Sequence, residues 1–106
     1  NAEVIFAAAA AGVQVVSKEM LKNAPSLLAI ADVNAVPPAG VEGMDLFMDG
    51  APLGDTNILG VGPLAIGDIK YKTESGLFKQ ILESDKALSL DFRHAYIKAK
   101  ELTGLV

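Results

Sequence analysis

The chain has no cysteine, no tryptophan and a single histidine among its 106 residues. The absence of cysteine excludes disulfide bonds, thiolate metal sites and cysteine nucleophiles, and one histidine excludes a multi-histidine metal cage. Basic residues are also few, since nine face thirteen acidic ones and the formal net charge is −4. This balance argues against a surface that holds a phosphate backbone. We therefore expect no metal, no nucleic-acid partner and a reducing, cytoplasmic setting.

Long apolar runs are absent as well. The longest extends from Val4 to Val16, which is shorter than the ~20 residues that a bilayer-spanning helix needs. No basic residue precedes this run, and Glu3 stands where a secretory signal carries positive charge. The sequence thus predicts neither a membrane anchor nor a secretory signal. Because the chain begins with Asn1 rather than methionine, its N-terminus is processed, a cloning remnant or the cut edge of a longer protein. We favour the cut edge on the resemblance described below.

The composition, 51% hydrophobic and 21% charged, is typical of one compact domain of this length. Two short apolar runs, Glu3–Ala7 and Leu27–Ala31, predict strands that are buried on both faces. Between them, Ser17 can cap a short helix over 17–22 that ends before Pro25. This strand–helix–strand order predicts an α/β fold with a parallel sheet.

The remainder of the chain divides into an irregular middle and a helical end. Glycines recur in the middle segment from Gly40 to Gly67, so regular helix is not expected there. Alternation over 44–48 predicts a half-exposed strand that closes in a turn at Asp49-Gly50, and Asn57–Leu59 predicts another strand. Two amphipathic helices follow, the first from near Thr73 and the second between Asp91 and Gly104. Their apolar faces consist of Leu77, Phe78, Ile81 and Leu82 in the first, and of Phe92, Ala95, Tyr96, Ala99 and Leu102 in the second.

Asp32 and Asn34 form the best candidate site. They follow the second strand, and open α/β sheets bind ligands beyond the carboxyl ends of parallel strands. The alternative is that both side chains cap neighbouring backbone N–H groups. The small residues from Ala7 to Gly12 allow a ligand to approach the backbone, although such residues are equally typical of helix–sheet packing.

The segment Gly60–Ala65 satisfies a permissive form of the dinucleotide fingerprint. The alternative is a tightly packed crossover between two parts of the fold, which we favour because no long helix is expected directly after it. Four acidic residues suggest calcium but lack the alternating ligand order, so a solvated acidic rim is the favoured interpretation. These residues are Glu42, Asp45, Asp49 and Asp55.

Several lysines and the single histidine are the remaining candidates for functional residues. Lys70 and Lys72 flank Tyr71 after the glycine-rich crossover, where an ammonium group can reach into a cleft, and solvated lysines are the alternative. We interpret His94, Lys98 and Lys100 as ordinary residues of a helix surface.

The segment Ile30–Asp45, which reads IADVNAVPPAGVEGMD, closely resembles the NADP-dependent methylenetetrahydromethanopterin and methylenetetrahydrofolate dehydrogenases. The resemblance extends upstream over Glu3–Gly12 and downstream over Gly60–Lys72. It covers essentially all of this chain but only the C-terminal part of the family's longer chain. The family's reaction is hydride transfer between the methylene carbon of a reduced pterin and nicotinamide, without metal or flavin.

The resemblance implies the C-terminal half of a Rossmann-like parallel sheet, followed by two amphipathic helices. Residues 1–68 would be part of the NADP-binding domain, and residues 69–106 would return to the substrate domain. It implies Lys70 as the catalytic ammonium group, and it implies cofactor contacts from Ala8, Ala9, Ala10, Gly12, Asp32 and Asn34. Expected partners are NADP, a reduced pterin, the missing N-terminal domain and, because a half-sheet has exposed edges, a further copy of the chain. The alternative function is a non-catalytic, truncated α/β module that acts in assembly only.

Overall fold

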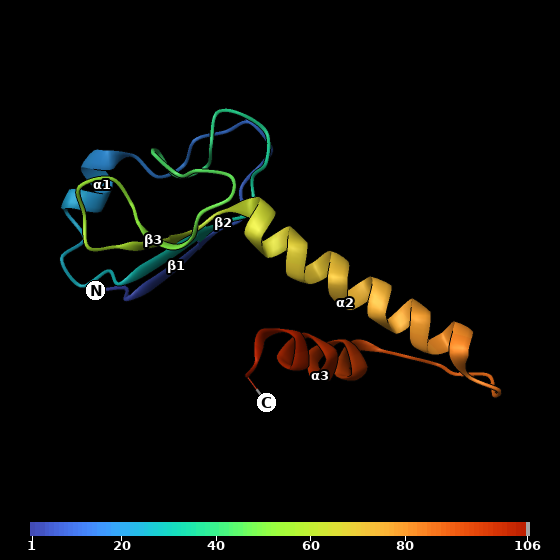
Figure 1. The fold of residues 1–106 in the computed structure, drawn as a ribbon. Coiled ribbons are helices and arrows are strands. Elements are labelled where there is room, and N and C mark those ends of the chain that lie inside the picture. The colour runs from blue at the N-terminus through green and yellow to red at the C-terminus, as the bar shows by residue number, and fades with distance from the viewer. Residues whose placement is uncertain (106) are drawn as a thin grey trace. The chain divides into compact units, whose positions relative to one another are not determined.

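The computed structural model describes residues 1–105, and the chain forms two compact units, Asn1–Ile66 and the part from Gly67 on. Figure 1 shows the elements in chain order. They are β1 (Val4–Ala7), α1 (Lys18–Lys22), β2 (Ala29–Asp32), β3 (Asp49–Pro52), β4 (Leu59–Val61), α2 (Pro63–Glu83) and α3 (Phe92–Thr103). The boundary between the units falls within α2.

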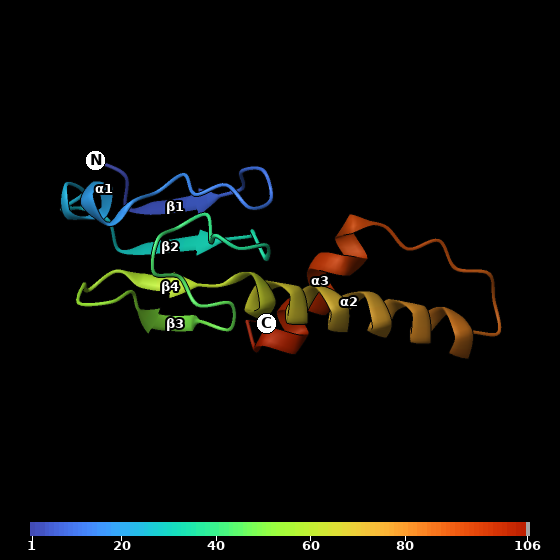
Figure 2. The same cartoon turned by 90° about the horizontal axis from the view of Figure 1, so that it is seen from above.

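The first unit is built on one sheet with the strand order β1-β2-β4-β3 (Figure 2). The pairs β1–β2 and β2–β4 are parallel, and β3 joins the edge antiparallel to β4. This confirms the predicted α/β class and the parallel pairing of the two apolar strands. The architecture fits half of a Rossmann-like sheet.

One face of this sheet carries the core. Ile30 from β2 is buried there together with Leu21 from α1, and α1 lies over this face in Figure 1. The remaining buried members of the core are Ala7, Leu27, Val41, Met44, Leu53 and Ile58. On the other face, Phe6 is 78% exposed, and Val4 and Leu59 are also exposed. The unit therefore covers an apolar sheet on one side only, and the prediction that the first strand is buried on both faces is wrong for β1.

The short helix α1 confirms the prediction for 17–22. The Ser17 side chain accepts a hydrogen bond from Met20 N at 3.2 Å, which satisfies one of the free N–H groups of the first turn. Leu21 is the buried residue of the helix and anchors it on the sheet.

The predicted strand over 44–48 is wrong. These residues form a turn, in which Asp45 Oδ1 accepts a hydrogen bond from Phe47 N and Met48 N donates to the Asp45 carbonyl. The strand β3 begins only at Asp49. The apolar alternation arises because Met44 and Met48 reach into the core beside Gly60, which a turn achieves as well as a strand does.

The start of the first long helix was also predicted wrongly. Helix α2 begins at Pro63, ten residues before Thr73, and it contains Gly67. Proline is favourable in the first helical turn because its missing N–H would have no partner there. Glycine content was therefore a poor guide to structure over 60–67.

Helix α3 confirms the predicted boundaries. Asp91 caps its start, and Gly104 ends it with a left-handed backbone conformation (φ +71°). Within the second unit, α2 approaches α3 at Gly76, where an added Cβ would lie 2.6 Å from Lys98 Cε. The predicted apolar faces are only partly covered, since Phe78, Leu82, Phe92 and Tyr96 are exposed. Over residues 1–105, no helix combines the length and apolar character that crossing a membrane requires.

Candidate site at the carboxyl ends of the parallel strands

The loops that follow β1 and β2 lie side by side because their strands are parallel neighbours. Their backbones are joined directly, since Val15 N and Val16 N both donate to the Gly40 carbonyl, at 2.8 and 3.0 Å. Glu42 N returns a bond of 2.8 Å to the Val16 carbonyl. Two loops that are far apart in sequence thus form one layer at the carboxyl end of the sheet.

Asp32 closes the loop after β2 upon itself. Its side chain is 1% exposed, Oδ1 accepts a hydrogen bond from Asn34 N at 2.9 Å, and Oδ2 accepts one from Val41 N at 3.0 Å. Gly40 packs directly on the carboxylate, because a Cβ at that position would lie 2.7 Å from Asp32 Oδ1. The buried carboxylate therefore defines the path of residues 34–41.

Asn34 joins this loop to the one after β1. It is 5% exposed, and its Oδ1 accepts hydrogen bonds from Gly12 N at 3.2 Å and from Val36 N at 2.9 Å. Its Nδ2 donates to the Pro38 carbonyl at 2.9 Å. Asp32 and Asn34 thus lie at the predicted sheet edge and have the backbone-capping role that was the alternative interpretation. Both orient backbone rather than present unpaired polar atoms.

The short segment Ala8–Gly12 forms the accessible part of this site. Ala8 and Ala10 are exposed, Ala9 and Gly12 are half-buried, and no side chain in the segment exceeds a methyl group. Gly12 adopts φ +74°, a conformation that favours glycine. A ligand at this edge would contact backbone and methyl groups. The Asn34 side chain holds this backbone in place through its hydrogen bond with Gly12 N.

Gly60 and Gly62 do not form a phosphate loop in this structure. An added Cβ at Gly60 would overlap Met48 Sδ, and one at Gly62 would overlap the Asp45 carbonyl oxygen. Gly62 N and Leu64 N are already used, since they donate to the carbonyls of Met48 and Leu46 at 2.7 and 2.9 Å. These glycines serve close packing against the 45–48 turn, which supports the crossover interpretation of the fingerprint.

Lys70 and Lys72 lie within α2, in the second unit, and not in an extended crossover as their predicted setting required. Two residues apart on a helix, they project in nearly opposite directions. Lys72 pairs with Asp68 at 2.6 Å. Lys70 is exposed, and among residues 1–105 no carboxylate lies within ion-pair distance of it.

Two of the four acidic residues singled out in the middle segment, Glu42 and Asp45, accept hydrogen bonds from backbone N–H groups. Glu42 accepts a hydrogen bond from Lys18 N at 2.8 Å, and Asp45 caps its own turn. Within the described part of the chain, no group of three or more carboxylate or histidine side chains is placed to hold a metal ion.

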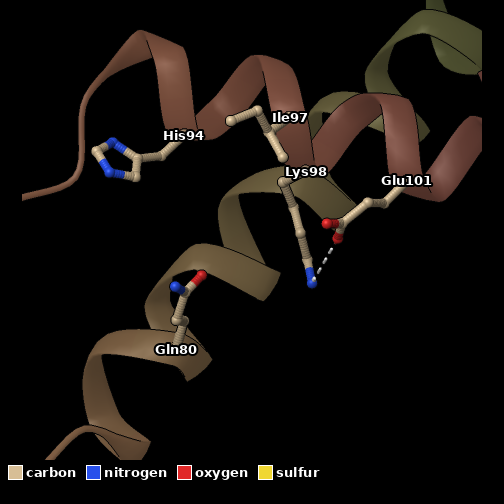
Figure 3. A pocket seen from close by; sticks show the side chains of 5 residues that line it. All are labelled: Gln80, His94, Ile97, Lys98 and Glu101. Atoms are coloured by element: carbon tan, nitrogen blue, oxygen red, sulfur yellow. Dashed lines mark ion pairs between the residues drawn. The ribbon is translucent and has the colours of Figure 1, made fainter. Parts of the chain in front are cut away.

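His94 has a role that the sequence analysis missed. Its Nδ1 accepts a hydrogen bond from Asp91 N at 3.1 Å, so Asp91 and His94 form a reciprocal cap at the start of α3. The signal was the spacing of three residues, with histidine in place of the usual glutamate. His94 also lines a small cavity of about 140 Å³ between α3 and α2, together with Gln80, Ile97, Lys98 and Glu101 (Figure 3).

The Arg93 guanidinium next to Asp91 lowers the pKa of that carboxyl to about 2, with a further contribution from the Arg93 backbone N–H. The pair is exposed and lies at the start of α3.

Comparison with known proteins gives a match over nearly the whole chain. The chain is 45% identical, over 104 residues, to the NAD(P)-dependent methylenetetrahydromethanopterin dehydrogenase of Methylorubrum extorquens strain AM1. The similarity is to a dehydrogenase. The "Bifunctional protein MdtA" of the same organism is 31% identical over 102 residues.

These matches cover 98% and 96% of this chain but only 35% and 34% of the two relatives. The chain thus spans about a third of the length of the curated relatives it matches. No protein-family profile matches the chain.

Proposed function

We propose that this chain is the C-terminal part of an NADP-dependent methylene-tetrahydropterin dehydrogenase that acts in the cytoplasm. The observation that carries the proposal is the 45% identity to a methylenetetrahydromethanopterin dehydrogenase over 98% of the chain. The reaction is hydride transfer between the methylene carbon of a reduced pterin, tetrahydromethanopterin or tetrahydrofolate, and the nicotinamide ring. The remaining two thirds of the enzyme supply the substrate domain and the first half of the nucleotide-binding sheet.

The topology of the sheet supports a nucleotide site next to β1. From β1 through β2 to β4 the chain moves in one direction across the sheet. Right-handed crossovers then place both connections on the same face, as the shared core around Leu21, Val41 and Met44 reflects. In a complete sheet of this kind, further strands continue beyond the free edge of β1, and their connections cover the opposite face. In this proposal, the missing part of the enzyme supplies those strands. The point where the two directions meet is the usual ligand crevice, and Ala8–Gly12 follow β1 at that point.

The residues at this edge fit a dinucleotide in size and polarity. Methyl-sized side chains from Ala8 to Ala10, followed by Gly12, allow the cofactor to approach the backbone closely. Asp32 and Asn34 act as positioning residues, since their oxygens hold the N–H groups of Gly12, Asn34, Val36 and Val41. Bound NADP supplies the hydride acceptor. The protein supplies orientation and excludes water, which are the main requirements of hydride transfer.

Lys70 supplies the functional ammonium group in this proposal. Lys72 is neutralised by Asp68, whereas Lys70 is exposed and unpaired among residues 1–105. A positioned cation can orient the pterin and stabilise charge that develops at the reacting centre.

A chimera tests the proposal. The 104 matched residues of this chain replace the corresponding segment of the Methylorubrum dehydrogenase, and hydride transfer is followed by the absorbance of NADPH with each of the two pterins. We expect turnover within about tenfold of the parent enzyme, because the fold and the loop network are retained. Replacement of Lys70 by alanine in the chimera should lower turnover roughly a hundredfold with little change in NADP affinity.

The matched control is Lys72→Ala, for which we expect a mild effect. A folded chimera that transfers no hydride would favour the assembly-only alternative. Equal losses at both lysines would place the catalytic groups in the other two thirds of the enzyme.

Calorimetric titration of the 106-residue chain with NADP should detect only weak binding, because in this proposal the phosphate-binding turn belongs to the missing part of the enzyme. A low-micromolar affinity would contradict that view.

A further inference from the structure

Another cavity lies in the first unit, next to α1. Its volume is about 370 Å³, and the residues that line it come from three segments that are far apart in sequence. These segments are α1, the loop at 42–43 and the connection between β3 and β4 at 53–56. The cavity shares no residue with the candidate site formed by Ala8–Gly12, Asp32 and Asn34. It is thus a separate place at which the first unit can hold a small molecule.

The deepest part of this cavity is apolar and rigid. Leu21 and Leu53 line it, are 5% and 3% exposed, and belong to the core. The connection that carries Leu53 is held by its own hydrogen bonds, because Thr56 Oγ1 donates to the Leu53 carbonyl at 2.7 Å and accepts from Ile58 N at 3.1 Å. An apolar group of a ligand would therefore contact a preformed surface.

Four charged side chains line the same cavity. Lys18 and Lys22 are four residues apart and lie on one side of α1, whereas Glu42 and Asp55 come from the two other segments. Among residues 1–105, none of these four side chains forms an ion pair. Two ammonium groups and two carboxylates at one cavity are therefore available to a ligand.

The carboxylate of Glu42 is held in a defined orientation. Its Oε2 accepts a hydrogen bond from Lys18 N at 2.8 Å. The Lys18 side chain lies close by, since its Cε is 3.8 Å from the position that a Cβ on Gly43 would occupy. A positive and a negative group thus lie near each other at the edge of the cavity.

We propose that this cavity binds a hydrophobic α-amino acid. The carboxylate of the ligand pairs with Lys18 and Lys22, its ammonium group pairs with Glu42 and Asp55, and its side chain packs on the two leucines. A ligand with a single charge is disfavoured, because one pair of side chains attracts it and the other pair repels it. An α-amino acid carries both charges on one carbon atom, which fits the proximity of Lys18 and Glu42.

Three compounds that differ by one charged group test the proposal. They are L-leucine, isocaproate, which lacks the ammonium group, and isoamylamine, which lacks the carboxylate. Binding to the full 106-residue chain is followed by NMR through the amide resonances of Gly43 and Gly54, with Gly104 in the second unit as the internal control. We expect leucine to bind with a roughly millimolar dissociation constant, and the other two to bind about fivefold more weakly because each lacks one set of ion pairs.

Two substitutions identify which side chains bind each end of the ligand. Lys22→Met should weaken the binding of leucine and isocaproate about fivefold and leave that of isoamylamine unchanged. Asp55→Asn should weaken the binding of leucine and isoamylamine and leave that of isocaproate unchanged. Lys86→Met, in the exposed connection between α2 and α3, is the matched control and should change none of the three affinities. Because Lys22 and Asp55 are exposed, both variants should fold, which circular dichroism checks.

Four results would overturn the proposal. They are no binding of leucine up to its solubility limit, equal or tighter binding of isocaproate or isoamylamine, resonance changes at Gly104 as large as those at Gly43 and Gly54, and a leucine affinity that neither Lys22→Met nor Asp55→Asn alters. The measurements require neither nicotinamide nor pterin, so their outcome is independent of the proposed dehydrogenase function.

Discussion

At the scale of single residues, Asp32 connects the fold to the candidate site. A buried carboxylate without a cationic partner is stable only where hydrogen bonds replace its hydration. Here the N–H groups of Asn34 and Val41 provide those bonds, one to each oxygen. Because both partners are N–H donors, position 32 requires a side chain with two acceptor oxygens.

Asp32→Asn should therefore destabilise the chain although it preserves the shape of the side chain. In either orientation, the amide NH₂ faces a backbone N–H, and one buried donor loses its partner. We expect a loss of about 1–3 kcal/mol in the free energy of unfolding, measured by urea denaturation. Asp49→Asn, at an exposed position in β3, should change stability by less than about 0.5 kcal/mol. Equal effects at the two positions would contradict the role assigned to Asp32.

Two glycines should respond to alanine with opposite signs. Gly40→Ala places a methyl group 2.7 Å from Asp32 Oδ1, and we expect a loss of about 1–3 kcal/mol. At Gly67, within α2, an added Cβ meets nothing within 4 Å. Gly67→Ala should stabilise the chain by about 0.5–1 kcal/mol, since alanine favours helix. Thermal unfolding of both variants checks this pair, and a loss at Gly67 would show that its surface is covered.

At the scale of elements, the start of α3 depends on a small charged cap. Asp91 accepts hydrogen bonds from the backbone and side chain of Arg93, and His94 reaches back to Asp91 N. None of the residues of α3 is buried. Because packing contributes little here, the cap has a large share in defining where the helix begins.

The contribution of Asp91 should disappear in acid. Its pKa in the folded chain is about 2, below the ordinary value of 3.8. Stabilisation by the carboxylate is thus fully present above pH 3.8 and is lost as the pH falls toward 2. The difference in unfolding free energy between the unsubstituted chain and Asp91→Ala should shrink over this interval. Asp85→Ala, in the exposed α2–α3 connection, is the control and should show no such trend. A difference in unfolding free energy that is independent of pH would show that the charge of the Asp91 carboxylate does not contribute to the cap.

At the scale of the whole molecule, the main feature of the first unit is a sheet that is apolar on both faces but covered on one. Parallel sheets are normally covered on both faces. Phe6, Val4 and Leu59 form the uncovered side, whereas Ile30 is 1% exposed on the covered side. This asymmetry agrees with a chain that spans a third of its relatives' length.

The two faces should differ sharply in their tolerance of substitution. Phe6→Thr keeps a residue that favours strands, and we expect a change in stability below about 0.5 kcal/mol together with higher solubility. Ile30→Ala, in the next strand, should cost about 2–5 kcal/mol because it leaves a cavity in the core. Urea denaturation and the soluble concentration at saturation measure both effects. A comparable loss at Phe6 would show that its face is packed in the isolated chain.

Local sequence sufficed for the elements whose signals are short-range. The apolar runs at 3–7 and 27–31 predicted the strands observed at Val4–Ala7 and Ala29–Asp32. The Ser17 cap and the Asp91–Gly104 boundaries were also predicted, because periodicity and capping act within a few residues. The placement of Asp32 and Asn34 at the carboxyl edge followed from the parallel order of the strands. The site residues Ala8, Ala9, Ala10, Gly12 and Lys70 remain predictions, as does NADP as the cofactor.

The sequence by itself determined the α/β class, the parallel pair β1–β2 and the edge of the sheet where Asp32 and Asn34 gather. Only the tertiary structure decided where α2 begins, which segment forms β3 and what the glycines at 60 and 62 do. The physical reason is the same in each case. The conformation of these residues depends on the turn at 45–48, whose carbonyl groups accept hydrogen bonds from Gly62 N and Leu64 N. Met48 of this turn and the preceding Met44 fill the space next to Gly60. A pattern of residues along the chain does not contain contacts made across twelve or more residues.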